Sequence, residues 1–198
     1  MTIQRSLEYP LRALTLSQKD CERIQRPILQ VVMPRTGLVS TFPKEILFAP
    51  KSCFGVGYRA LYETQGIEHV LCIIQHLQST SLTGNLLQAT LQALVLDAGS
   101  GKRPLWDDIG YVGAYSTESW LKHTWLFCNE YNVKVKTGDV RLRLRCQGDQ
   151  FLMDAFLANK YPSLVWKHIN QCRLFLWVYC ISHVVSADEK TGAVVFVW

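Results

Sequence analysis

Apolar residues recur with a helical period in two neighbouring stretches of the chain. The first stripe is made of Ile67, Val70, Leu71, Ile74 and Leu77, and the second of Leu86, Leu87, Leu91, Leu94 and Val95. Spacings of three and four residues bring such side chains to one face of an α-helix, so helices are predicted at about residues 67–77 and 83–98. Gly99 is a natural stop for the second helix. Because only residues 79–84 connect them, the two helices are expected to form an antiparallel pair.

An earlier helix is predicted at residues 17–32. Ser17 is a suitable N-cap, and Asp20 places a carboxylate in the first turn, where the helix dipole favours negative charge. Pro27 lacks a backbone N–H, so a kink or the start of a new helix is expected there. Residues 34–60 are rich in proline and glycine, which predicts an ordered loop with a short helix at about residues 43–48.

The second half of the chain begins with a predicted linker at residues 99–117, followed by a helix ending near Asn132. Residues 133–136 and 140–146 alternate between apolar and polar residues around a glycine-containing turn, which predicts a β-hairpin near 133–146. Further helices are expected at 149–158 and from Ser163 onward, and residues 192–198 are predicted to form a strand or an irregular end. The fold class is therefore mainly α (α+β): a helical region at 1–98, and a second one at 118–198 that contains the small β-hairpin.

The composition is that of a folded protein. Of the 198 residues, 48% are hydrophobic and 19% are charged, which argues against disorder. The seven cysteines are an odd number and none forms a C-x-x-C pair, which argues against a disulfide framework and favours a reducing, intracellular compartment, cytoplasmic or nuclear. No signal peptide is recognised in the first residues, and the longest apolar run, 174–181, is too short to cross a bilayer, so no membrane partner is expected.

The net charge of +5 is unevenly distributed along the chain. Residues 1–60 contain nine Lys or Arg against four Asp or Glu, residues 61–130 three against seven, and residues 131–198 nine against five. Two basic ends therefore flank an acidic middle. This asymmetry suggests a polyanionic partner, and an ordinary solvated surface is the alternative.

Cations also alternate along the predicted hairpin. One of its faces would carry Lys134, Lys136, Arg141, Arg143 and Arg145. Alternate residues of a strand lie about 7 Å apart, a spacing near that of successive phosphates, and guanidinium groups bind phosphate through two hydrogen bonds. The hairpin therefore either contacts a polyanion or presents a solvated polar face that keeps an edge strand soluble.

No motif for catalysis, metal binding or cofactor binding is complete. The run Gly-Ser-Gly-Lys-Arg at 99–103 lacks the first glycine and the hydroxyl residue of a P-loop. Asp107 and Asp108 resemble a Mg²⁺-binding pair but lie in a Pro/Gly-rich stretch, which favours a surface loop. Cys172, Cys180 and His183 are unevenly spaced and have no obvious fourth ligand. Since both cysteines lie in an apolar stretch, they are interpreted as buried free thiols. We therefore predict no catalytic residue, no metal and no cofactor.

Three sequence blocks have a recognisable order. The first comprises residues 14–21 and 24–27, the second residues 42–43, 48–51, 54–62 and 65–70, and the third residues 149–154, 169–176 and 181–188. Together they resemble the region just after the palm in the reverse transcriptases of non-LTR (LINE-like) retroelements, over about residues 12–190. Two positions depart from that family, which usually reads Gly-Gly-Leu-Gly where this chain has Phe54-Gly55-Val56-Gly57, and Asp-Gly where Asp188 precedes Glu189.

The resemblance implies that residues 1–98 are a thumb-like helical region, which in polymerases grips the backbone of the template–primer duplex. It also implies that the metal-binding aspartates lie upstream, so this chain would be a non-catalytic fragment rather than an enzyme. The candidate backbone contacts are Arg35, Lys44, Lys51 and Arg59 in the thumb-like region and Arg141, Arg143 and Arg145 on the hairpin. The residues after Lys190 do not fit the family and are interpreted as a truncated or decayed reading frame.

The expected function is residual, sequence-independent and salt-dependent binding to the backbone of RNA or DNA, with no small-molecule substrate. Two alternatives stay open. One is a helical protein-interaction module without nucleic-acid affinity, whose exposed aromatic side chains bind a partner or a second copy. The other is a small enzyme that uses a Cys–His pair in a pocket.

Overall fold

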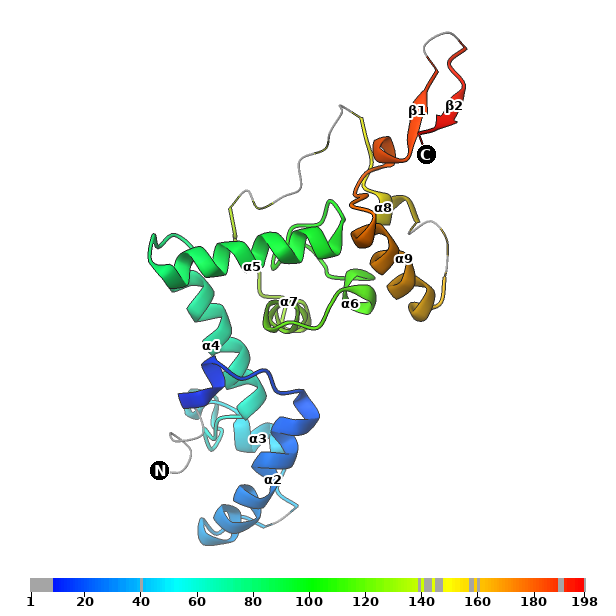
Figure 1. The fold of residues 1–198 in the computed structure, drawn as a ribbon. Coiled ribbons are helices and arrows are strands. Elements are labelled where there is room, and N and C mark those ends of the chain that lie inside the picture. Colours follow the sequence, from blue (N-terminus) through cyan, green and yellow to red (C-terminus); the bar gives the residue numbers. More distant parts are fainter. Residues whose placement is uncertain are drawn as a thin grey trace. The chain divides into compact units, whose positions relative to one another are not determined.

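The chain is mainly helical, as predicted, with a small antiparallel β-hairpin (Figure 1). The computed structural model describes residues 9–39, 41–138, 140, 144, 148–156, 159, 161–188 and 191–197. The chain divides between Cys72 and Ile73 into two compact units, a division that falls inside a helix. The sequence prediction placed the division at residues 99–117 instead.

Unit 1 contains four helical elements and the first part of a fifth. In chain order they are η1 (Tyr9–Arg12), α2 (Gln18–Arg35), α3 (Lys44–Phe48), η2 (Lys51–Cys53) and the beginning of α4 (Leu61–His76). Ser17 caps α2 as predicted, since its hydroxyl accepts a hydrogen bond from the Asp20 backbone N–H (3.2 Å). The helix continues through Pro27, so no new helix starts there.

The core of unit 1 forms where η1 and α2 meet α4. Leu11, Cys21 and Leu61 are the buried members of this cluster. Two buried polar side chains of α4 hold the connecting segment in place. The Gln65 amide bonds both the N–H (2.9 Å) and the carbonyl oxygen (3.0 Å) of Leu16, and His69 Nε2 lies 3.0 Å from the Leu11 carbonyl oxygen. These bonds satisfy buried polar groups that would otherwise destabilise the fold.

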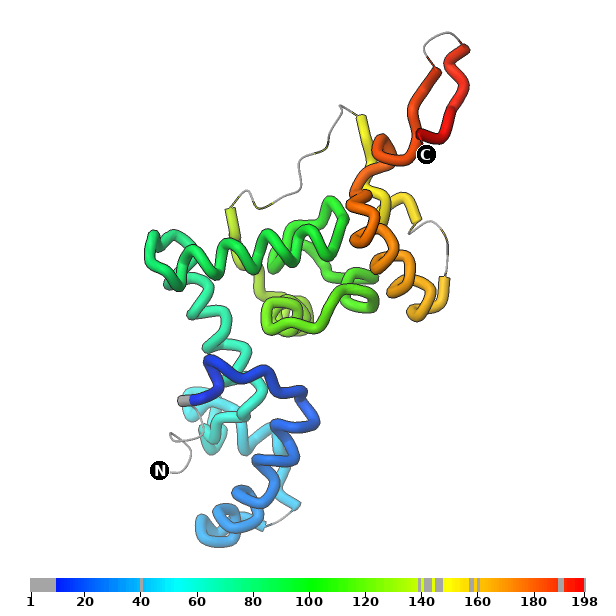
Figure 2. Tube along the Cα trace, in the orientation of Figure 1, coloured from blue at the N-terminus to red at the C-terminus, as the bar shows by residue number. Residues whose placement is uncertain are grey.

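Unit 2 contains the remaining elements (Figure 2). They are α5 (Leu82–Ala98), α6 (Val112–Tyr115), α7 (Trp120–Glu130), α8 (Leu152–Phe156), α9 (Ser163–Phe175), η3 (Ile181–His183), β1 (Val185–Ala187) and β2 (Val194–Phe196). Helix α5 packs against α7, and α6 packs against α9. The strands pair in register with Val185 opposite Phe196 and Ala187 opposite Val194. The strand predicted at 192–198 is thus present.

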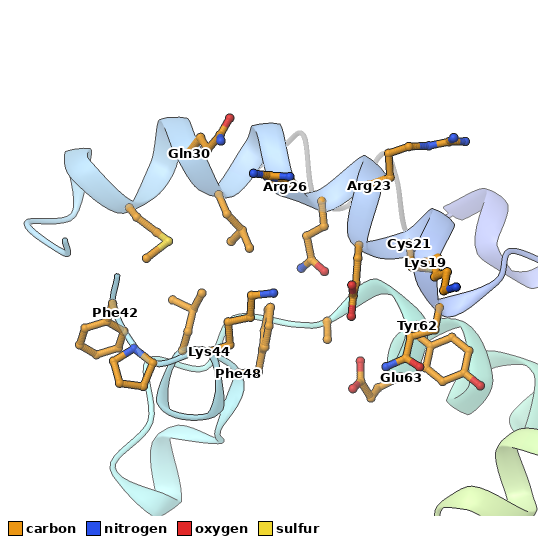
Figure 3. Close-up of a pocket in the computed structure, with 18 of the residues that line it drawn as sticks. Lys19, Cys21, Arg23, Arg26, Gln30, Phe42, Lys44, Phe48, Tyr62 and Glu63 are labelled. Carbon is orange, nitrogen blue, oxygen red and sulfur yellow. The ribbon is translucent and has the colours of Figure 1, made fainter. Parts of the chain in front are cut away.

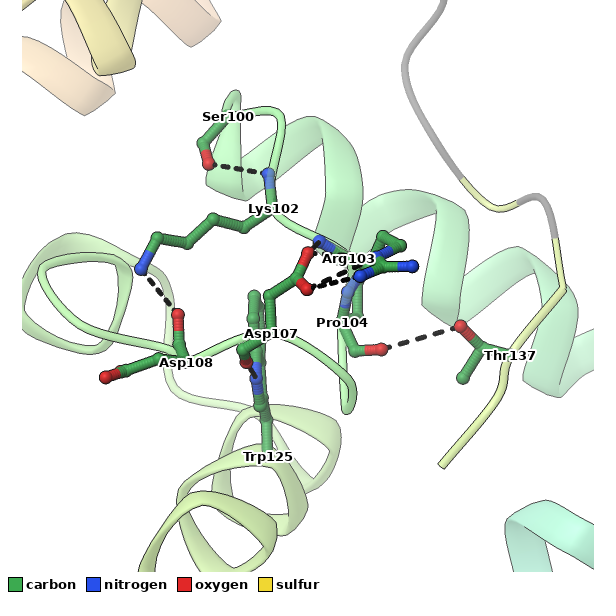
Figure 4. A network of polar contacts seen from close by, with 8 residues as sticks. All are labelled: Ser100, Lys102, Arg103, Pro104, Asp107, Asp108, Trp125 and Thr137. Carbon is green, nitrogen blue, oxygen red and sulfur yellow. Dashed lines mark hydrogen bonds and ion pairs between the residues drawn. The ribbon is translucent and has the colours of Figure 1, made fainter. Parts of the chain in front are cut away.

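Residues 99–117, predicted as a linker, contribute to the core of unit 2. Leu105, Ile109, Val112 and Tyr115 are all buried, and the segment includes α6. An irregular segment can be buried only if its polar groups are bonded. Here the hydrogen-bond partners come from the loop itself. The Asp107 carboxylate accepts hydrogen bonds from the backbone N–H and from the guanidinium of Arg103 (Figure 4).

The hairpin predicted near 133–146 is not seen in the described part of that range. Residues 133–138, 140 and 144 belong to no strand. The reason is a different partner: Val135 N–H donates to the Leu105 carbonyl oxygen (2.9 Å), and the buried Thr137 hydroxyl donates to that of Pro104 (3.5 Å). This segment therefore lies along the loop at 104–105. Arg141, Arg143 and Arg145 lie outside the described residues.

The C-terminal end of α5 is closed by side chains from other helices. Arg173 of α9, which is 2% exposed, donates to the carbonyl oxygens of Leu96 (3.0 Å) and Asp97. The Tyr115 hydroxyl donates to the Ala98 carbonyl oxygen (2.8 Å). Gly99 adopts φ +56°, and a Cβ there would lie 2.3 Å from the guanidinium carbon of Arg173. The guanidinium charge thus sits at the negative end of the helix dipole.

We predict that Arg173→Ala lowers the free energy of unfolding by about 2–4 kcal/mol, because it leaves buried carbonyl groups of α5 without a donor. Urea unfolding followed by circular dichroism measures the change. Lys167→Ala on the exposed side of α9 is the matched control and should stay within about 0.5 kcal/mol of the parent. An Arg173→Ala protein as stable as this control would contradict the assigned capping role.

Candidate nucleic-acid interface

A groove of about 990 Å³ runs along α2 in unit 1 (Figure 3). Its walls are α2, residues 41–48 including α3, and residues 60–63. Four cations line it: Lys19, Arg23 and Arg26 from α2 and Lys44 from α3. Two carboxylates, Glu22 and Glu63, also line it. The lining therefore has an excess of positive charge.

The three α2 cations share one face because they are spaced four and three residues apart. Arg23 forms an ion pair with Asp20 (3.1 Å). The Ser17 hydroxyl donates to the same carboxylate (2.6 Å), and this bond, with Arg23, lowers the pKa of Asp20. Arg23 therefore faces a carboxylate that stays charged, which reduces its capacity to bind an external anion. Within the described residues, Lys19 and Arg26 form no ion pair.

Apolar side chains lie between the cations. Leu29 and Met33 of α2 line the groove together with Phe42, Leu47 and Phe48, and Lys44 extends between α3 and α2 beside Phe48 (Figure 3). Lys44 is exposed and forms no ion pair in the described part of the chain. A groove with flexible cations above an apolar floor suits a ligand that has both negative groups and flat or apolar parts.

The loop after α3 folds back onto that helix through its backbone. Val56 N–H donates to the Ile46 carbonyl oxygen (3.0 Å), and Tyr58 N–H to that of Leu47 (3.0 Å). Gly55 lies so close to Ala49 that a Cβ would be 2.0 Å from the Ala49 carbonyl oxygen. These contacts give Lys51 and Arg59 defined backbone positions beside α3.

Of the four predicted site residues that lie in the described part of the chain, Arg35, Lys44, Lys51 and Arg59, only Lys44 lines the groove. Arg35 ends α2, Lys51 begins η2, and both are exposed outside the groove lining. Arg59 is exposed and accepts a hydrogen bond at its carbonyl oxygen from the Gln25 amide (2.8 Å).

Sequence reasoning missed the α2 cations of this groove, Lys19, Arg23 and Arg26. The signal was present, since their spacing places them together on the helix predicted at residues 17–32. The sequence alone does not show which face of that helix stays exposed, because this depends on which residues pack against the opposite face.

A second pocket, of about 420 Å³, lies in unit 2. It is lined by residues 105–108, by Trp125, Cys128 and Asn129 of α7, and by residues 132–134 after that helix. The Asp107 carboxylate accepts a hydrogen bond from the Arg103 guanidinium (2.7 Å; Figure 4). The Asp108 carboxylate accepts one from the Gly110 backbone N–H (2.6 Å). The Lys102 ammonium donates to the Asp108 carbonyl oxygen. The two aspartates therefore stabilise their own loop, and no group of three or more metal-ligating side chains is found among the described residues.

The prediction that Cys172 and Cys180 are buried thiols is correct for Cys180 and wrong for Cys172. Cys172 is exposed because it lies on α9 away from the face that buries Trp166, Asn170 and Arg173.

Comparison with protein-family models, with curated proteins and with solved structures finds no match to this chain. None of the helices in the described ranges is long and apolar enough to span a membrane.

The wall of the groove near Cys21 yields a chemical prediction. Burial raises the pKa of the Cys21 thiol to about 11, and the carboxylates of Asp20 and Glu63 add to the shift. Only the thiolate reacts with alkylating reagents. At about pH 8, iodoacetamide should therefore modify the exposed Cys53 and leave the buried Cys21 unmodified until the pH approaches 11 or urea is added. Peptide mass spectrometry reads the two sites separately, and equal rates in the native protein would contradict this packing.

Proposed function

We propose that this chain is a non-catalytic fragment of a retroelement reverse transcriptase and that unit 1 binds the backbone of a template–primer nucleic acid. The excess of positive charge along the α2 groove carries the binding part of the proposal. The likeness of three sequence blocks to the post-palm region of non-LTR reverse transcriptases supports the lineage.

Three of the groove's cations are suited to phosphate contacts. Lys19, Arg26 and Lys44 are exposed, come from two helices and form no ion pair among the described residues. Lys19 and Arg26 lie about 10 Å apart along the axis of α2, at a rise of about 1.5 Å per residue. Separate phosphates of one strand can therefore be bound by separate cations. Ammonium groups on flexible stems bind phosphate without reading the base sequence.

Affinity falls as salt rises, because each phosphate contact releases counterions on binding. We predict that Lys44→Gln, which removes one such contact, makes the slope of log affinity against log salt concentration shallower by about 0.7–0.9. The double variant Arg26→Gln/Lys44→Gln should lower it by about twice as much, equally for unrelated sequences. Fluorescence anisotropy with a labelled primer–template, titrated between about 50 and 200 mM salt, measures both slopes.

Lys167→Gln, an exposed lysine of α9 in unit 2, is the control for overall charge. It should keep the parent slope. Absence of binding at about 50 mM salt, or a slope that these groove substitutions do not change, would refute nucleic-acid binding by the groove.

The open edge of β2 favours a second candidate function, a protein-interaction module that binds a second copy of the chain. Val197 N–H donates to the Val184 carbonyl oxygen (2.9 Å), so these two residues face one another across the hairpin. Hydrogen-bonding direction alternates along an antiparallel strand. Val194 and Phe196 therefore direct their N–H and C=O groups away from β1.

Two copies of β2 can pair antiparallel about a twofold axis at Val195. This register places Val194 opposite Phe196 of the partner subunit, and both residues offer outward backbone groups. Each of these side chains is 72% exposed. Pairs of aromatic and β-branched residues stabilise adjacent strands, and residues 191–197 contain no charge to oppose the pairing.

Paired charge substitutions test this register. Val194→Lys/Phe196→Lys would place lysine opposite lysine twice across the axis and should give a monomer, because like charges opposite one another destabilise the pair. Val194→Lys/Phe196→Glu would place lysine opposite glutamate twice and should retain the dimer. Light scattering over a concentration series measures both masses. A parent protein that is monomeric throughout, or two double variants that behave alike, would exclude this interface.

A further inference from the structure

Phe54 stands out among the apolar side chains of unit 1 because it is 98% exposed. It follows η2 directly, at the turn of the loop that folds back onto α3. Its backbone adopts φ +60°, in the left-handed region that bulky side chains rarely occupy. A phenylalanine ring in this position contributes no hydrophobic stabilisation to the fold, so its exposure requires another explanation.

The turn that carries Phe54 is held by backbone hydrogen bonds. Phe54 N–H donates to the Lys51 carbonyl oxygen (3.1 Å), and Gly55 N–H donates to that of Pro50 (3.0 Å). The next N–H groups, beginning with Val56, are bonded to α3 and its extension. These bonds fix the backbone at Phe54, and with it the direction in which the Cα–Cβ bond leaves the turn. The ring is presented to solvent by a defined backbone.

The segment that carries the ring has an excess of positive charge. Residues 41–60 contain the exposed cations Lys44, Lys51 and Arg59 against the single carboxylate of Glu45. The hydrogen bonds between the loop and α3 hold these residues and Phe54 in one local structure. A flat aromatic ring among cations complements a polyanion that carries flat rings, which is the chemistry of an unpaired nucleic-acid strand.

We propose that Phe54 stacks on an unpaired nucleobase of a strand whose phosphates contact the neighbouring cations. This inference rests on the proposed nucleic-acid binding and adds to it a preference for single strands and for duplexes with a single-stranded extension over blunt duplexes. Bases inside a duplex are stacked on one another and cannot accept the ring, whereas every unpaired base has an accessible face. The stacking is independent of base identity.

Binding of Phe54 variants to three labelled probes tests the proposal: a blunt duplex, the same duplex with a single-stranded extension, and the extension alone. We expect Phe54→Ala to weaken binding to the two probes that contain unpaired bases by about 5- to 100-fold. Binding to the blunt duplex and the salt slope should not change. Phe54→Trp should retain the affinity, and Phe54→Leu, which is apolar without a ring, should lose it.

Phe175→Ala is the matched control, since Phe175 is 83% exposed and lies in unit 2. It should bind all three probes like the parent. Unchanged single-strand affinity in Phe54→Ala, with the groove variants still lowering the salt slope, would overturn the stacking proposal alone. Equal losses on the blunt duplex and the single strand, or retained affinity in Phe54→Leu, would also overturn it. A parent that binds no probe would overturn it together with the proposed function.

Discussion

The backbone hydrogen bonds that fold residues 55–58 onto α3 determine the character of unit 1. Helix α3 is only five residues long and would be marginal alone. The bonds from Val56, Gly57 and Tyr58 extend its contacts and require the close approach of Gly55 to Ala49. They join α3, which carries Lys44 at its start, to the turn that carries Phe54. A proline- and glycine-rich stretch thus becomes a rigid support for charge and for an aromatic ring.

In unit 2 the same requirement, that buried backbone groups have partners, is met by side chains. Arg173 and Tyr115 bind the last carbonyl groups of α5, while Asp107 holds the loop that follows. These bonds allow an irregular segment to be buried, so that α5, α6 and α9 share one core. The aspartates of that loop bond residues of the same loop: Asp107 binds the Arg103 guanidinium, and Asp108 accepts from the Gly110 N–H.

Among the described residues of unit 1, some cations form ion pairs and others do not. Arg12 and Arg23 are paired with Glu68 and Asp20, whereas the groove cations Lys19 and Arg26 form no such pair within the described residues. Exposed ion pairs contribute little to stability. This distribution leaves an excess of positive charge along one groove, and the proposed phosphate binding rests on that excess.

The sequence by itself determined the mainly helical class and the places of several helices. A helix cap such as Ser17 and an apolar stripe such as that of α5 depend on residues that are close together in the sequence. They can therefore be recognised without knowledge of the rest of the chain. Only the tertiary structure decided that residues 99–117 belong to a core, that Val135 pairs with Leu105, and that Lys44 joins cations from α2. Those outcomes depend on partners far away along the chain, and local periodicity carries no information about which distant segment will supply a hydrogen bond or a facing charge.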